Sequence, residues 1–261
     1  GANKVYGMLH GIQGLLQERY VDLEDHIKND LDIELLKRTP SAYLGSCRFK
    51  LPDISQDREI YDKIFDILNK LEIEYFFYIG GNDSMDTIKK LSDYSLLNGS
   101  NIRFMGVPKT IDNDLAATDH TPGYGSAAKY IGSITKEVIR DGLVYDQQNV
   151  TILEIMGRNA GWLTGAAALA KCEDCEGPDM IFLPEVTFDV DEFMKKVAEL
   201  HKKKKSVVVA VSEGVKTADG RYVCELTDGI DFVDAFGHKQ LTGTARFLAE
   251  KINREVGCKT R

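Results

Sequence analysis

The sequence predicts an α/β fold in which a mostly parallel sheet is covered by helices on both faces. The main observation is an alternation between apolar runs of strand length and amphipathic stretches of helix length. A second is that some runs are apolar throughout, as in Val207–Val211. Strands that helices cover on both faces have this character, and they are usually parallel.

The first elements follow in order. Apolar residues recur at helical spacing over Ile60–Leu71, which predicts a helix. The aromatic-rich run Glu74–Ile79 then predicts a buried strand that ends at a glycine pair. Met85–Leu91 begins a second helix, and Ile102–Val107 is the next strand, which Pro108 stops.

The same alternation continues in the second half of the chain. Val150–Ile155, Met180–Leu183 and Val207–Val211 are predicted strands. A Gly/Ala-rich helix is expected from about Ala160 to Leu169, and the last helix from about Leu241 to Val256. Ligands of such sheets bind beyond the carboxyl ends of the strands, so the loops that directly follow strands are the candidate site.

Composition excludes several classes of function. The 261 residues are 43% hydrophobic and 28% charged, as in an ordinary globular protein, and the net charge is −8. This charge argues against duplex nucleic acid or an anionic membrane as a partner, and no apolar run approaches the ~18 residues of a spanning helix. Five cysteines, an odd number, favour a reducing cytoplasm over a disulfide framework. Cys172-x-x-Cys175 has no second pair at zinc-like spacing, so a structural or incidental role is expected.

The first strand-end loop is Gly80-Gly81-Asn82-Asp83-Ser84. Paired glycines allow a ligand to approach the backbone, and the helix N-terminus that follows offers free N–H groups to an anion. A tight turn in which Asp83 or Ser84 caps the helix explains the same residues equally well.

The second loop, Pro108–Asp114, carries more polar groups. Asp112 and Asp114 are two carboxylates. One could accept a proton from an attacking hydroxyl, and the other could hold a metal or orient the base. Lys109 could neutralise phosphate oxygens, and Thr110 adds a hydroxyl. The alternative is a solvated turn rich in Asp and Asn.

Three other segments offer one charged group each. Arg158, in Met156-Gly157-Arg158, is placed to bind a phosphate or sugar oxygen, and Glu213 could accept sugar hydroxyls. Arg48 follows another glycine loop. A surface arginine beside a glycine turn is the simpler interpretation of Arg158, and the segments of Glu213 and Arg48 are weak evidence when each is taken alone.

Seven segments together, in order and nearly over the whole chain, resemble the phosphofructokinase family. They are Leu44–Arg48, Gly80–Ser84, Pro108–Asp114, Thr121–Ala127, Met156–Arg158 with Gly161, Pro184-Glu185 and Ser212–Gly214. The resemblance implies transfer of a phosphoryl group to the 1-hydroxyl of fructose 6-phosphate, with Mg²⁺ as cofactor.

The resemblance also implies roles for single residues. Asp112 matches the general base, Asp114 the carboxylate near magnesium, and Thr110 a hydroxyl beside the transferring group. Arg48 matches an arginine that reaches the phosphates. Asn82 stands where the family usually has a metal-side Asp, so it keeps an acceptor oxygen and loses the charge.

On the acceptor side, the resemblance assigns Met156, Gly157 and Arg158 to the sugar phosphate and Glu213 to the sugar hydroxyls. Arg261 falls where the family has an arginine that binds the 6-phosphate of a neighbouring subunit, which implies a homodimer or homotetramer.

The implied architecture is two doubly wound, Rossmann-like lobes with the active site in the cleft between them. Residues 1–125 would hold the phosphoryl donor, with the chain end 241–261 returning to this lobe, and residues 126–240 would hold the sugar phosphate. The family also has a first strand with a Gly-rich phosphate loop before the position of Gly1, and a His/Arg segment after that of Arg261.

Asp83 and Lys109 resemble the diphosphate-dependent branch of the family, since ATP-using relatives typically have glycine at both positions. The Asp83 carboxylate would repel the α-phosphate of a nucleotide, and Lys109 would hold a compact, highly charged donor. The alternatives are an ATP-dependent enzyme of the same family and a non-catalytic regulatory subunit that keeps the fold.

Overall fold

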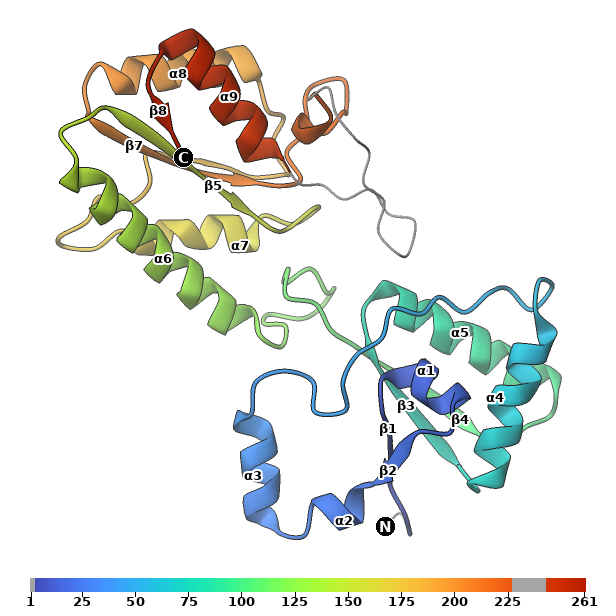
Figure 1. The fold of residues 1–261 in the computed structure, drawn as a ribbon. Coiled ribbons are helices and arrows are strands. Elements are labelled where there is room, and N and C mark those ends of the chain that lie inside the picture. Colours follow the sequence, from blue (N-terminus) through green and yellow to red (C-terminus); the bar gives the residue numbers. More distant parts are fainter. Residues whose placement is uncertain (1–2, 227–242) are drawn as a thin grey trace. The chain divides into compact units, whose positions relative to one another are not determined.

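The structure, a computed structural model, describes residues 3–226 and 243–261. It divides into two compact units, Gly1–Pro108 and Lys109–Arg261 (Figure 1). The expected boundary at residue 125 is therefore too late in the chain. The loop after Pro108 is part of the second unit, although the strand that leads into it belongs to the first.

The first unit has two small sheets. β1 (Tyr6–Met8) pairs antiparallel with β2 (Tyr20–Asp22), and β3 (Tyr75–Gly80) pairs in parallel with β4 (Arg103–Pro108). The helices of this unit are α1 (Gly11–Leu16), α2 (Leu23–His26), α3 (Asp30–Arg38), α4 (Arg58–Lys70) and α5 (Asn82–Leu97). The predicted strands β3 and β4 and their parallel pairing are confirmed.

Helix α4 shows how the first core forms. Asp57 caps its first turn by accepting a hydrogen bond from the Ile60 N–H at 3.1 Å. Its apolar stripe, which includes Ile64 and Leu68, is fully buried against α1, α5 and one face of β3 and β4. That face carries Phe76, which is 8% exposed.

The other face of β3 corrects the prediction of a fully buried strand. Tyr75, Phe77 and Ile79 are 50%, 60% and 68% exposed, because α1, α4 and α5 all pack on the opposite face. Successive side chains of a strand point to opposite faces, so covering one face leaves every second aromatic residue open. Among the described residues, the first unit is thus covered on one side of its parallel sheet.

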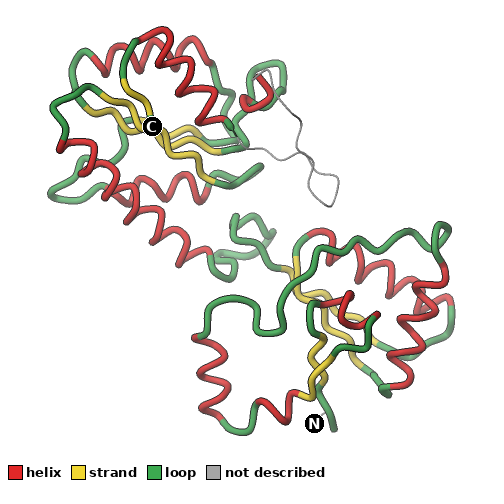
Figure 2. The backbone as a smooth tube through the Cα atoms, in the orientation of Figure 1, coloured by secondary structure: helices red, strands yellow, loops and turns green. Residues whose placement is uncertain are grey.

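The second unit is doubly wound, as expected. Its sheet has the order β6-β7-β5-β8, in which all neighbours are parallel. Helices α8 and α9 cover one face, and α6 and α7 cover the other (Figures 1 and 2). The bounds are α6 (Tyr124–Val144), β5 (Asn149–Ile155), α7 (Trp162–Gly165), β6 (Met180–Phe182), α8 (Val190–His201), β7 (Ser206–Ser212), α9 (Thr244–Val256) and β8 (Lys259–Thr260).

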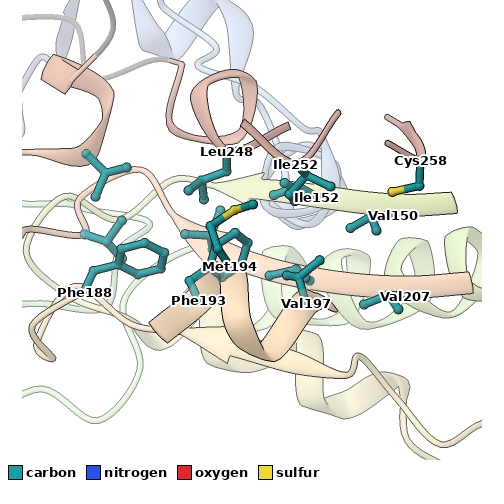
Figure 3. Close-up of a cluster of buried hydrophobic side chains, with 14 residues drawn as sticks. Val150, Ile152, Phe188, Phe193, Met194, Val197, Val207, Leu248, Ile252 and Cys258 are labelled. Atoms are coloured by element: carbon teal, nitrogen blue, oxygen red, sulfur yellow. The ribbon is translucent and has the colours of Figure 1, made fainter. Parts of the chain in front are cut away.

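Residues of β7 divide between two cores. Val207 and Val209 face α8 and α9, where they join Phe193 and Leu248 in the cluster that Figure 3 shows in part. Ala210 faces the opposite side and packs with α7. All seven residues of β7 are buried, so this strand lies at the centre of the unit. Its position therefore determines where the loop that follows Ser212 begins.

The chain end corrects a second prediction. Leu248 and Ile252 of α9 are fully buried in the core of the second unit, and β8 pairs with β5. The segment expected to return to the first lobe therefore completes the second. The described part of the last helix begins at Thr244, and residues 241–242 lie outside the described residues.

The Gly/Ala-rich segment is not one α-helix. It forms the short α7 and then a 3-10 helix, η1 (Ala166–Ala170), which packs closely on α6. A second 3-10 helix covers Val223–Leu226. In the part of the chain that the structure describes, none of the helices combines the length and apolar character needed to cross a bilayer.

Candidate active site

Two of the predicted loops leave the first parallel sheet at the same edge. Gly80 and Pro108 are partners in the register of β3 and β4, and each is the last residue of its strand. The donor loop, Gly80–Ser84, and the base loop, Lys109–Asp114, therefore both start at this edge, as expected for parallel strands.

The donor loop leads directly into α5. Gly81 is the N-cap of this helix and no side chain caps it, so neither Asp83 nor Ser84 has the capping role that the simpler interpretation gave them. Asn82 and Asp83 lie in the first helical turn, whose N–H groups have no partners within the helix. A Cβ added to Gly80 would collide with the hydroxyl oxygen and the Cβ of Ser84, so a side chain at this position would force Ser84 to shift. The free N–H groups of this turn could receive an anion, which stays the prediction made from the sequence.

The loop that carries Arg48 is held beside β3. Cys47 contacts Tyr78, whose hydroxyl also interacts with Ser84 of the donor loop. Burial, together with the Cys47 thiol, raises the pKa of Tyr78 to about 12, so its hydroxyl stays protonated. The predicted donor residues Arg48 and Ser84 are thus linked through the Tyr78 ring to one end of the sheet.

Asn113 fixes the shape of the base loop. It is 8% exposed and has a left-handed backbone with φ 60°. Its Oδ1 accepts a hydrogen bond from the Thr121 N–H at 2.9 Å, and its Nδ2 donates to the Asp119 carbonyl at 3.2 Å. The Asp112 N–H donates to the Thr110 hydroxyl at 3.1 Å. These contacts hold the predicted base from both sides.

The Asp112 carboxylate is half-buried, and its Oδ1 has no hydrogen-bond partner among the described residues. Burial raises the pKa of Asp112 above its usual range, and the neighbouring Asp114 carboxylate adds to the rise, whereas Arg158 and Lys109 oppose it. A carboxylate whose pKa is moved toward neutrality is a better proton acceptor from a hydroxyl. The structure therefore brings together four residues that the sequence predicted, from two separate loops.

The loops after β5 and β7 are interlocked. The Ser212 hydroxyl donates to the Gly157 carbonyl at 2.7 Å, and the Gly157 N–H donates to Glu213 Oε1 at 3.3 Å. On Gly214, a Cβ would lie 2.0 Å from the Arg158 carbonyl oxygen, which shows how closely the two backbones approach. Arg158 is therefore positioned by a rigid pair of strand ends.

Glu213 belongs to the same cluster as the base. Burial raises the pKa of Glu213, the Gly157 N–H and Arg158 lower it, and the Asp112 carboxylate raises it further. One carboxylate oxygen accepts from the Gly157 N–H, so the group is oriented by the neighbouring loop after β5. Acidic and basic side chains thus surround a small region of the second unit where a hydroxylated, phosphorylated ligand would find partners for both kinds of group.

Two residues predicted to bind the sugar phosphate, Met156 and Arg261, form no hydrogen bond or ion pair with the carboxylates of Asp112 and Glu213 in the part of the chain that the structure describes. Met156 is 52% exposed at the end of β5. Arg261 forms an ion pair with Asp141 at 3.0 Å and lies over the Tyr145 ring. Its role toward a neighbouring subunit stays a prediction.

Sequence reasoning missed two positioning residues. The sequence pattern around Asn113 predicted only a polar turn, although Asn is one of the residues that tolerate a left-handed backbone. Glu185 was noted within a motif without a role, and its Oε1 accepts a hydrogen bond from the Gly161 N–H at 2.7 Å, which holds the loop after Arg158.

Comparison with known proteins decides the family. The phosphofructokinase family matches the chain over residues 1–261. The chain belongs to the phosphofructokinase family. A pyrophosphate--fructose 6-phosphate 1-phosphotransferase from Xanthomonas campestris is 41% identical over 258 residues, which are 98% of this chain and 60% of that protein. An ATP-dependent 6-phosphofructokinase 2 from Streptomyces coelicolor is 32% identical over 257 residues, or 98% of this chain and 68% of that protein.

A solved structure agrees. The pyrophosphate-dependent phosphofructokinase from Nitrosospira multiformis superposes with a TM-score of 0.78 at 36% identity, covering 99% of this chain and 59% of that one. The family resemblance and the α/β fold predicted from the sequence are thereby confirmed. The chain spans about 60% of the length of the pyrophosphate-dependent relatives named here.

Proposed function

We propose that the protein containing this chain transfers a phosphoryl group from inorganic diphosphate to the 1-hydroxyl of fructose 6-phosphate. The observation that carries the proposal is the cluster of Asp112, Asp114, Lys109 and Arg158, in which burial and charge shift the pKa of one carboxylate upward beside two cations. Phosphoryl transfer needs such a base, together with positioning and cations around the equatorial oxygens.

In this mechanism Asp112 accepts the proton of the attacking sugar hydroxyl through a carboxylate oxygen. Lys109 and Arg158 stabilise the charge on the transferring phosphate. The Thr110 hydroxyl, which accepts a hydrogen bond from the Asp112 N–H, lies beside that phosphate. Glu213 accepts hydrogen bonds from sugar hydroxyls, while Gly157 and Met156 line the sugar-phosphate side. Arg48 and the first turn of α5 bind the donor.

The residues fit a magnesium ion that is held mainly by the substrate. Mg²⁺ is usually bound by one or two carboxylates and by phosphate oxygens, and Asp114 is an exposed carboxylate two residues from the base. Bound there, the ion would neutralise the developing charge on the phosphates. Asn82 fits less well, because it lies at a helix N-terminus, whose positive potential disfavours a cation.

Diphosphate is favoured over ATP by Asp83 and Lys109. Asp83 lies in the first turn of α5 without being its cap, so a negative charge stands beside the N–H groups that would otherwise receive a nucleotide phosphate. Lys109 is exposed and close enough to lower the pKa of Asp112. The curated relative at 41% identity is named for pyrophosphate, which supports the same choice.

The further partners follow from the same proposal. We propose that the protein works in the cytoplasm as a homodimer or homotetramer in which Arg261 binds the 6-phosphate in a neighbouring subunit. Sedimentation that shows a fully active monomer would exclude this role of Arg261.

A coupled assay of the intact protein, run with diphosphate and with ATP, tests the reaction. We expect turnover with diphosphate, and Asp112→Asn should lower it by ~10²-fold or more while fructose 6-phosphate still binds. Asp119→Asn is the matched control, since it removes an exposed carboxylate from the same loop. Preference for ATP would overturn the donor, and binding without any turnover would favour a regulatory subunit.

Lys109→Gly tests the donor separately. Loss of one transition-state cation typically costs ~3–4 kcal/mol, which corresponds to a decrease of roughly 10²–10³-fold in diphosphate-driven turnover. Asp83→Gly should allow ATP to bind measurably, because it removes the repelling charge. Unchanged turnover in Lys109→Gly would remove the main support for diphosphate.

A further inference from the structure

Cys172 and Cys175 close a tight turn just after η1. The Cys172 N–H donates to the Cys175 carbonyl at 2.9 Å, and the Cys175 N–H donates to the Cys172 carbonyl at 3.2 Å. A hydrogen-bonded antiparallel pair places its Cα atoms about 5.5 Å apart, with both side chains on one face. This Cα separation lies within the range of disulfides, whereas the Cβ atoms of such a pair lie about 4.5–5.5 Å apart and must approach by up to about 1 Å before the bond can form. Neither cysteine is in a disulfide.

The two thiols differ in accessibility. Cys172 is exposed, whereas Cys175 is buried and only 8% accessible. A dissolved reagent therefore reaches the first sulfur and not the second. An accessible thiol next to a second thiol that can resolve its adduct is the usual arrangement of reversible cysteine oxidation.

Charged groups of α6 surround the exposed thiol. Lys136 Nζ donates a hydrogen bond to Cys172 Sγ at 3.0 Å, and the Cys172 thiol donates to Asp174 Oδ1 at 3.0 Å. Asp174 is ion-paired with Lys136 at 2.8 Å and with Arg140. Lys136 is therefore the cation within reach of the Cys172 sulfur, where its charge would pair with a thiolate that forms during the reaction.

We propose that Cys172 and Cys175 form a reversible dithiol–disulfide site that is oxidised by low-molecular-weight disulfides. The Cys172 thiolate attacks one sulfur of R–S–S–R, which forms a mixed disulfide and releases RS⁻. The Cys175 thiolate then attacks the Cys172 sulfur, which forms the internal disulfide and releases the second RS⁻. The two electrons that the protein thiols lose reduce R–S–S–R to two thiols, which take up the two protons.

The same geometry makes the product easy to reduce. The disulfide would close a turn of only four residues at an exposed position, so it constrains the unfolded chain little. Strained or exposed disulfides have the more oxidising potentials and are the labile ones.

Glutathione disulfide is the probe. The reduced intact protein is equilibrated with increasing ratios of glutathione disulfide to glutathione, and the remaining thiols are trapped by alkylation before peptide mass analysis. We expect the peptide with both cysteines to lose two hydrogens and to take no label, and dithiothreitol to reverse the change. A wild-type protein that carries only one stable glutathione on Cys172 would overturn the proposal.

Variants separate the two sulfurs and the role of the lysine. Cys175→Ser should hold a stable glutathione on Cys172, whereas Cys172→Ser should leave the buried Cys175 unmodified. Lys136→Gln should slow formation of the adduct by about threefold or more. Lys129→Gln removes a charge from the same helix as a control and should not. Equal rates in Lys136→Gln and wild type would refute the role of Lys136, and a fast reaction of Cys175 in Cys172→Ser would refute the order of attack.

Discussion

Replacement of Asn113 by glycine tests whether the base loop is held by its side chain. Glycine tolerates the left-handed φ of 60°, so the change removes the side chain without straining the backbone. Two hydrogen bonds are lost, from the Thr121 N–H at 2.9 Å and to the Asp119 carbonyl at 3.2 Å. At ~1 kcal/mol each, the loop should lose ~2 kcal/mol against local opening, which is a roughly 30-fold larger open population.

Hydrogen exchange at Thr121 reports on this change, because its amide is the donor to Asn113 Oδ1, and it should be at least about 30-fold faster in Asn113→Gly. Because Asp112 precedes Asn113, we expect kcat to fall about tenfold or more while KM for the sugar phosphate changes little. Sugar-phosphate contacts are assigned to the loops after β5 and β7, whose hydrogen bonds do not involve Asn113.

Asn149→Ala is the matched control in the same unit. Asn149 is 4% exposed, and its side chain bonds to the Gly142 and Gln147 carbonyls and to the Ser206 hydroxyl. Its loss should destabilise the unit by a similar amount and leave both Thr121 exchange and kcat unchanged. If Thr121 exchange rises in Asn113→Gly while kcat stays at the wild-type value, Asn113 does not position the base.

Three further predictions concern the second unit. The pKa of Asp112 is raised in the folded protein, so the free energy of unfolding should fall as pH rises past the ordinary Asp pKa of ~3.9. Asp112→Asn should therefore raise the Tm at pH 7 and remove part of that pH dependence. Glu154→Ala should cost about 2 kcal/mol in chemical denaturation, since its carboxylate accepts two N–H groups at the start of α9, at 3.2 and 2.8 Å. Gly214→Ala should raise KM for the sugar phosphate about tenfold by displacing Arg158, whereas Gly165→Ala, where an added Cβ meets nothing within 4 Å, should not.

Much of the fold was predictable because the spacing of apolar residues along the chain reflects which side chains are buried. The strands β3, β4, β5 and β7 lie where the apolar runs placed them, since each run is long and is stopped by glycine, proline or a polar loop. The base loop was predictable for the same reason. Once two parallel strands are located, the residues that follow them must lie at one edge of the sheet, whatever their identity.

The destination of the chain end was not predictable from local pattern. An amphipathic helix such as α9 shows which face is apolar and not which sheet that face covers. The decisive contacts are pairings distant in sequence, such as Val150 with Thr260 in the β5–β8 register. The exposure of Phe77 and Ile79 has the same origin, because an aromatic-rich strand looks alike whether helices cover one face or both.

Asn113 shows why the site was harder to predict than the fold. Its Oδ1 accepts from the Thr121 N–H and its Nδ2 donates to the Asp119 carbonyl. Both hydrogen bonds exist only because the loop folds back on itself, which the sequence does not show. That fold-back places Asp112 where burial and Asp114 both raise its pKa, a position that disfavours its charged form. A carboxylate ionised under these conditions costs stability, and Lys109 and Arg158 offset only part of the cost. The two hydrogen bonds of Asn113 are therefore best explained as the local contacts that keep an unfavourably placed base in position.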